Sequence, residues 1–328
     1  MRHSLLIWLA TFGIVHAAES DLLAIDNLIS KFRCRHLYLD VGTNIGLQLN
    51  RLYRPEILPD NDDGFASAFD AAFGKAPGRN CRVCAIGFEP NPRHAAHLEV
   101  LQATHNAAGV GVLVIKAAAT TVDSGSLTFF TQARRAGGSL HVVGGDEAAT
   151  ANPFASNNGH GKPEQALLER VVVPTVDLAQ IFHRARDALV RQNDGRERSM
   201  IVAKIDIETT EYSVVPHLIM QQAMCVPNVV LMEWHSKMIS PVQLGRNPKG
   251  LSYPEQGKSL ILSYVHMLEK WVMDSVSAAS TASPPNKKAR GCHTNIQSML
   301  GNTMSRQNLK AFNTTKWPTP TSLCAPPA

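Results

Sequence analysis

The chain has 328 residues, a net charge of +5 and six cysteines. This length provides for a sizeable hydrophobic core and is compatible with one large α/β domain. The basic residues are scattered except for the cluster Lys287, Lys288 and Arg290, and no basic stripe is interleaved with aromatic residues. The composition therefore argues against nucleic acid as a partner.

Residues 1–18 have the pattern of a signal peptide. Arg2 precedes an apolar run from Leu5 to Val15, and the run is followed by the small residues Ala17 and Ala18. Such a run is too short to span a bilayer comfortably. We expect a location in the secretory pathway (ER or Golgi lumen, or secreted), with no stable membrane span after signal cleavage. An uncleaved signal anchor in the Golgi membrane is the alternative.

The segment 37–46 predicts a short strand that breaks into a glycine-spaced turn before a helix. Asp40 ends the strand, and Gly42, Asn44 and Gly46 form the turn. Glycine lets the backbone approach a ligand that a Cβ atom would block. The spacing differs from the Gly-x-Gly-x-x-Gly of dinucleotide enzymes. An acid before the first glycine favours a cationic cofactor, and S-adenosylmethionine is one.

A second buried strand, 83–88, ends in another acid, Glu89, and is followed by a helical run at 92–106. An acid at the tip of the second strand of an open parallel sheet can bind both ribose hydroxyls of a nucleotide cofactor. In a compact unit the two acids are about 20 residues apart, and Glu89 lies much further than that from Asp40. We therefore expect an insertion over about 55–80, with a small helix around 65–73.

The even number of cysteines fits disulfide pairing in an oxidising compartment. If the strands that end at Asp40 and Glu89 pair in register, Cys34 lies opposite residue 83 and its Cα is about 6 Å from that of Cys84. We expect that disulfide, or failing it one between Cys34 and Cys81. No second Cys or His pair has ligand spacing, so a zinc site at Cys81-x-x-Cys84 is disfavoured and no metal site is predicted.

The rest of the chain alternates strands and helices, which predicts a doubly wound, mainly parallel sheet with helices on both faces. Further strands are expected at 110–118, 126–131, 170–176, 200–207 and 228–234. Helices are expected at 178–191, with Asp177 as N-cap, and at 211–224 and 256–274. The Gly- and Asn-rich segment 133–163 has the length of an active-site lid. Residues 275–328 read as a linker and an irregular tail.

Polar residues on the fourth core strand provide the candidate catalytic groups. Lys204, Asp206 and Glu208 share one face by the period-two alternation of a strand, and His235 follows the neighbouring fifth strand, just after Glu233. Charges on a core strand are costly unless they are paired or functional. We assign Asp206, Glu208 and His235 to the site. The alternative is a structural salt-bridge network that joins Lys204 to Asp206 or Glu233.

Five motifs together resemble the FkbM-type methyltransferases. They are Asp-Val-Gly-Thr-Asn-Ile-Gly at 40–46, Phe-Glu-Pro-Asn-Pro at 88–92, Thr-Val-Asp at 175–177, Lys-Ile-Asp-Ile-Glu at 204–208 with Glu211, and Glu-x-His at 233–235. The resemblance implies a Rossmann-like class I methyltransferase domain over residues 19–274. It also implies S-adenosylmethionine, with its methionine end at Asp40, Gly42, Asn44 and Gly46 and its ribose at Glu89.

The chemistry implied by the resemblance is methylation of a hydroxyl. The secretory location favours a glycan or a secreted small molecule as acceptor. The chain departs from the family pattern at Thr209, where a glycine is usual, and a Thr would be strained if that position needs a positive φ. The alternative is therefore a secreted non-catalytic module that keeps the fold. A nicotinamide-dependent oxidoreductase is disfavoured because the glycine fingerprint and a Tyr-x-x-x-Lys pair are missing.

Overall fold

The computed structural model describes residues 19–57, 64–121, 125–132, 141–142, 168–194, 199–207, 210–235, 267, 270 and 295–298. The expected signal peptide, Glu208 and Thr209 lie outside the described residues. So do nearly all of the expected lid and most of the chain after residue 235, including all but Met267 and Lys270 of the expected helix at 256–274.

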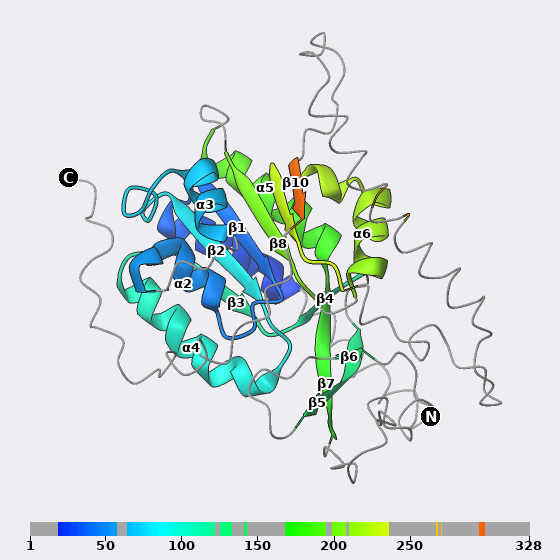
Figure 1. The fold of residues 1–328 in the computed structure, drawn as a ribbon. Helices are drawn as coiled ribbons and strands as arrows, with labels where there is room; N and C mark the ends of the chain where they lie inside the picture. The colour runs from blue at the N-terminus through cyan, green and yellow to red at the C-terminus, as the bar shows by residue number, and fades with distance from the viewer. Residues whose placement is uncertain are drawn as a thin grey trace, which may run out of the picture.

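The core of the protein is a six-stranded sheet in which every neighbouring pair of strands is parallel. Its strands are β1 (His36–Val41), β2 (Val83–Phe88), β3 (Val112–Ile115), β8 (Ile201–Ile205), β9 (Val229–Met232) and β10 (Asn295–Ser298). The order β10-β9-β8-β1-β2-β3 (Figure 1) is the doubly wound order 3-2-1-4-5-6 read from the other edge. The order reverses between β1 and β8, where such sheets bind ligands.

Helices cover both faces of this sheet, as the alternation of elements predicted (Figure 1). On one face the helical residues 19–32, α5 (Leu178–Gln192) and α6 (Glu211–Met220) pack against alternate strand residues such as Leu37 and Leu39. On the other face α2 (Leu47–Tyr53), α3 (Phe65–Phe73) and α4 (Pro92–Ala107) pack around Tyr38. The expected small helix of the insertion is α3.

A second sheet of four strands has the order β4-β7-β5-β6. It contains β4 (Ala118–Thr120), β5 (Ser126–Gln132), β6 (His141–Val142) and β7 (Leu168–Asp177). The prediction of one strand at 110–118 was therefore wrong, because that run supplies β3 to the central sheet and β4 to the second sheet. The chain leaves the edge of the central sheet at the exposed residue Lys116 and then pairs with β7.

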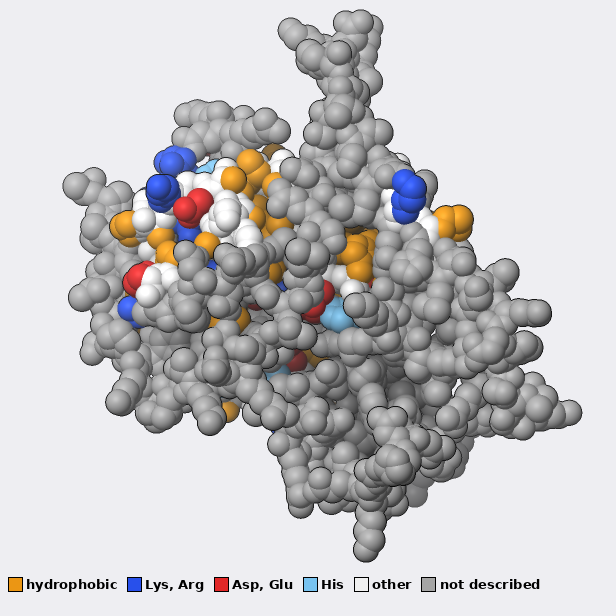
Figure 2. Space-filling model, in the orientation of Figure 1, with side chains coloured by type: hydrophobic (Ala, Val, Ile, Leu, Met, Phe, Trp, Pro, Cys, Tyr) orange, Lys and Arg blue, Asp and Glu red, His pale blue; other side chains and the backbone are white. Residues whose placement is uncertain are grey.

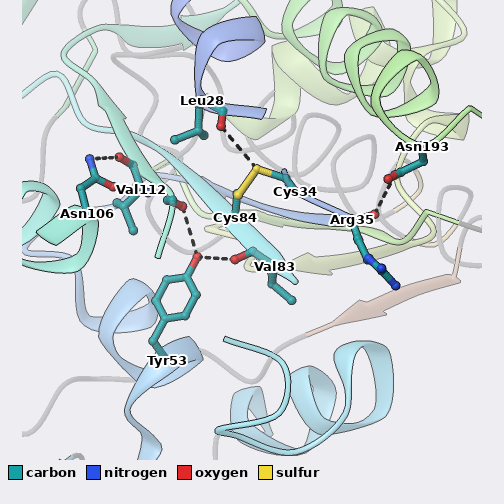
Figure 3. The surroundings of a disulfide bond; sticks show 10 residues. Leu28, Cys34, Arg35, Tyr53, Val83, Cys84, Asn106, Val112 and Asn193 are labelled. Atoms are coloured by element: carbon teal, nitrogen blue, oxygen red, sulfur yellow. Dashed lines mark hydrogen bonds between the residues drawn. A yellow bond between two sulfur atoms is a disulfide. The ribbon is translucent and has the colours of Figure 1, made fainter. Parts of the chain in front are cut away.

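The expected disulfide between Cys34 and Cys84 is present, with a Cα–Cα distance of 5.5 Å (Figure 3). The register from which it was predicted was wrong by two residues, because Asp40 pairs with Gly87 rather than with Glu89. Cys34 reaches Cys84 because the regular register ends before β1, where the backbone N–H groups of Arg35 and His36 both donate to the carbonyl of Arg82 at 2.9 Å. Cys81 is also disulfide-bonded, so Cys81 and Cys84 are not a redox pair with each other.

Helix α6 and strand β10 also differ from the prediction. Helix α6 ends at Met220 rather than at residue 224, since Gln222 takes a left-handed φ of 55° and a short 3-10 turn, Ala223–Cys225, follows. Strand β10 lies in the segment that was expected to be irregular, and it pairs in parallel with β9. Among the described residues, no helix has both the length and the apolar composition needed to cross a bilayer.

Candidate functional site

The glycine loop after β1 lies at the switch point of the central sheet and touches the end of β8. Gly42 has a φ of +85°, and a Cβ atom there would lie 1.8 Å from the backbone oxygen of Asp206. The backbone N–H of Asp206 donates to the carbonyl of Val41 at 3.0 Å, so the pairing of β1 with β8 continues past the end of β8. Only glycine fits at position 42, for reasons of both conformation and space.

Glu89 connects the end of β2 to this loop. Its Oε2 atom accepts a hydrogen bond of 2.6 Å from the backbone N–H of Asn44, and its Oε1 atom accepts one of 2.9 Å from Asn91. Asn44 has a left-handed φ of 53°. Gly46, with a φ of 79°, begins α2, and a Cβ atom there would lie 2.5 Å from Leu101 of α4. The five residues expected at the cofactor are thus gathered at one edge of the sheet.

Asp40 is completely buried and has partners within the protein. Its Oδ1 atom accepts a hydrogen bond of 3.2 Å from the Tyr38 hydroxyl and lies 3.6 Å from Lys204 Nζ, whereas its Oδ2 atom has no partner among the described residues. Burial raises the pKa of Asp40 to about 6, against the opposing effects of Lys204 and Tyr38.

Lys204 joins the glycine loop to Asp206. Its ammonium group donates to the carbonyl of Gly42 at 2.9 Å and lies 2.9 Å from Asp206 Oδ2. Burial lowers the pKa of Lys204, but the carboxylates of Asp206 and Asp40 outweigh this effect and hold the pKa above its ordinary value. Lys204 is therefore a buried cation, and its ion pair with Asp206 is one that the structural alternative predicted.

A second polar cluster lies at the ends of β8 and β9, and we call Asp206, Glu233 and His235 the acid–histidine cluster. His235 Nε2 lies 3.6 Å from Asp206 Oδ1 and 3.7 Å from Glu233 Oε1. The three side chains are 24%, 21% and 11% exposed, respectively. Acidic and histidine side chains are visible side by side near the middle of the face in Figure 2. The predicted convergence of Asp206 and His235 is confirmed.

Glu211, the first residue of α6, orients His235. Its side chain is completely buried, and its Oε1 atom accepts hydrogen bonds from the backbone N–H of His235 at 2.8 Å and from ring Nδ1 at 3.0 Å. A carboxylate only accepts hydrogen bonds, so Nδ1 carries a proton, and when the ring is neutral its lone pair is on Nε2. The sequence analysis noted Glu211 within a motif but did not assign it to the site. An acid in the first turn of a helix is common, so sequence alone gave no distinguishing signal.

Asp177 has the predicted N-cap role and also a second contact. Its Oδ1 atom accepts a hydrogen bond of 2.8 Å from the backbone N–H of Ala179 at the start of α5. The same oxygen lies 2.9 Å from Nε2 of His217 on α6. This motif residue thus ties α5 to α6 and lies in neither of the two polar groups described above.

Comparison of the chain with family models, with curated proteins and with solved structures found no match. The fold and the site therefore define the class of the protein only as an α/β protein with a Rossmann-like parallel sheet. Its function has to be argued from the groups at the carboxyl end of that sheet.

Proposed function

We propose that the protein is an S-adenosylmethionine-dependent methyltransferase of the FkbM type, which methylates a hydroxyl of a glycan or a secreted small molecule. The observation that carries this proposal is the bond between Glu89 and the backbone of Asn44. It joins the residue expected at the ribose to the loop expected at the methionine. Both lie at the carboxyl ends of the parallel strands, the ligand-binding edge of such sheets.

The loop and Glu89 would divide the binding of the cofactor between them. Gly42 and Gly46 let the loop pack closely against Asp206 and Leu101, which would hold its backbone in place for the ligand. Each oxygen of Glu89 accepts one backbone hydrogen bond, and a carboxylate has about four acceptor positions. Glu89 therefore keeps acceptor positions for the ribose hydroxyls. Asp40, which is paired with Tyr38 and Lys204, would act mainly by holding the loop.

The acid–histidine cluster would receive the acceptor hydroxyl. Transfer of the sulfonium methyl group needs an in-line arrangement of oxygen, methyl carbon and sulfur first, and removal of the hydroxyl proton second. His235 has a lone pair on Nε2, and Asp206 lies beside it. We assign His235 to the proton and Asp206 to the orientation of the hydroxyl. Glu208, the third expected catalytic residue, lies outside the described residues.

Binding and turnover should be tested separately on the full-length protein. S-adenosylmethionine at 100 times its dissociation constant should raise the free energy of unfolding by about 2.7 kcal/mol, whereas NAD should not. Incubation with methyl-labelled cofactor and a panel of glycans, lipids and polyphenols, followed by mass analysis, should then identify a methylated product. Stabilisation by NAD alone would contradict the proposal. Binding of S-adenosylmethionine without transfer to any acceptor would favour the non-catalytic alternative.

A further inference from the structure

We infer that Asp206, Glu233 and His235 form a binding site for one divalent transition-metal ion. The sequence analysis predicted no metal site, and the three residues lie in two separate motifs. The inference does not depend on the proposed function, since the ion would bind whether or not the protein transfers methyl groups.

The distances between the three side chains suit a metal ion. One ligand atom from each residue can be chosen so that all three lie within 4.8 Å of one another. His235 Nε2 lies 3.6 Å from Asp206 Oδ1 and 3.7 Å from Glu233 Oε1. For an ion about 2.1 Å from each ligand atom, these distances correspond to angles of about 120° between the bond to Nε2 and the bond to each carboxylate oxygen. Small side-chain rotations of Asp206 and Glu233, which are partly exposed, would complete the coordination. Partial exposure also leaves room for water or a substrate oxygen as a further ligand.

Two of the three groups, Asp206 and His235, are held from outside the cluster, and this is the feature that favours a built site. Lys204 binds Oδ2 of Asp206 at 2.9 Å, which leaves Oδ1 toward His235. Glu211 binds Nδ1 of His235 and so leaves the lone pair on Nε2. A carboxylate that fixes the other ring nitrogen is the usual companion of a metal-binding histidine.

The charges at this end of the sheet also favour a bound cation. Asp40, Asp206, Glu211 and Glu233 bring four carboxyl groups together, and Lys204 pairs with Asp40 and Asp206. Within the part of the chain that the structure describes, two completely buried oxygens, Oδ2 of Asp40 and Oε2 of Glu211, have no hydrogen-bond partner. Buried carboxylates without compensation are costly. An ion on Asp206, Glu233 and His235 would supply positive charge beside them.

The ligand set indicates the kind of ion. One imidazole with two carboxylates and open positions suits Zn²⁺, Mn²⁺ or Fe²⁺ better than Ca²⁺ or Mg²⁺, which prefer oxygen ligands alone. If the protein is a methyltransferase, the ion would lower the pKa of a coordinated acceptor hydroxyl. His235 would then act as a ligand, and the hydroxyl proton would pass to solvent water instead of to its Nε2.

The test is metal binding to the untagged full-length protein after treatment with a chelator and its removal. Calorimetry with Zn²⁺ and Mn²⁺ should find one site per chain, and the spin-resonance signal of free Mn²⁺ should decrease with the same stoichiometry. Glu233→Gln and His235→Gln should each weaken binding at least tenfold. Glu211→Gln should weaken it by about 10- to 100-fold, as expected for a group that orients a ligand.

The matched controls are Glu99→Gln and His183→Gln, which alter an exposed acid on α4 and a histidine on α5 far from the cluster in the sequence. Both control variants should bind the ion as the wild type does. Glu233→Gln has nearly the same shape as the native residue and changes a partly exposed side chain, so it should fold. The inference is overturned if the wild type binds neither ion at millimolar concentration. It is also overturned if folded Glu233→Gln and His235→Gln retain the affinity and stoichiometry of the wild type.

Discussion

Gly42 and Asp206 approach so closely that a Cβ atom on Gly42 would lie 1.8 Å from the backbone oxygen of Asp206. The contact is between backbone atoms of the loop after β1 and the end of β8, and neither can move without parting the two central strands. It is the tightest approach at the candidate site, and it links the glycine loop to the acid–histidine cluster.

Replacement of Gly42 by Ala should therefore destabilise the protein more than the same change at Gly74. Gly74 also has a positive φ, of +81°, but a Cβ atom there would meet nothing within 4 Å. Gly74→Ala should cost about 1–3 kcal/mol for the backbone conformation alone. Gly42→Ala adds the clash with Asp206. Urea unfolding of the two variants measures the difference, and equal losses of free energy would show that the loop can move away from β8.

The disulfide between Cys34 and Cys84 should stabilise the fold substantially, because the two cysteines are 50 residues apart in the sequence. Loop-closure entropy for such a length gives about 4 kcal/mol, and measured values are commonly about 2–4 kcal/mol. The double variant Cys34→Ala/Cys84→Ala should lose stability of this size in urea unfolding. Non-reducing peptide mapping of protein secreted from cells provides the direct check, since a free Cys34 thiol there would contradict the pairing.

Ionisation of Asp40 should lower stability as the pH rises. The pKa of Asp40 is raised from 3.8 to about 6 in the folded protein, so the folded state binds the proton more tightly than the unfolded state does. The contribution of Asp40 to the free energy of unfolding is present in full below about pH 4 and is lost as the pH rises through about 6. The free energy of unfolding of the wild type minus that of Asp40→Asn should therefore fall between these values and be flat above about pH 7. A difference that rises over the same range would mean that Lys204, rather than burial, dominates the pKa.

Replacement of Glu89 by Ala should weaken S-adenosylmethionine binding by about 1–3 kcal/mol, because charge-assisted hydrogen bonds to the ribose would be lost. The control is Glu99→Ala, which removes an exposed acid of α4 that is paired with Lys116. Glu89 also holds the backbone of Asn44 and Asn91, so the stability of each variant has to be measured beside calorimetric affinity. A folded Glu89→Ala protein with unchanged affinity would remove Glu89 from the cofactor site.

His235→Ala and Asp206→Asn should each lower the single-turnover rate by about 10²- to 10⁴-fold, with a smaller effect on cofactor affinity. His183→Ala, which removes a histidine bonded to the carbonyl of Gln221, should leave both quantities unchanged. If Asp206 instead binds the amine of the cofactor, its variant will lose affinity and rate together. Wild-type rates in both variants would make the acid–histidine cluster structural.

The sequence alone determined which segments form the elements of the central sheet. Apolar runs of β-branched residues predicted β1, β2, β8 and β9 to within a few residues. Helical runs predicted α4 and α5, the second with Asp177 as its capping residue. The alternation of strands and helices predicted the parallel sheet with two covered faces. These features depend on local patterns, which a sequence records directly.

Only the tertiary structure decided how those segments meet. The register of β1 against β2, the transfer of the run at 110–118 to a second sheet and the addition of β10 depend on pairing partners far away in the chain. The same holds for Glu211, which becomes a site residue because the start of α6 is packed against the residue that follows β9. The role of a side chain at this edge depends on which oxygen or nitrogen atom of another element lies close to it. The distance between the two atoms is fixed by packing rather than by neighbours in the sequence.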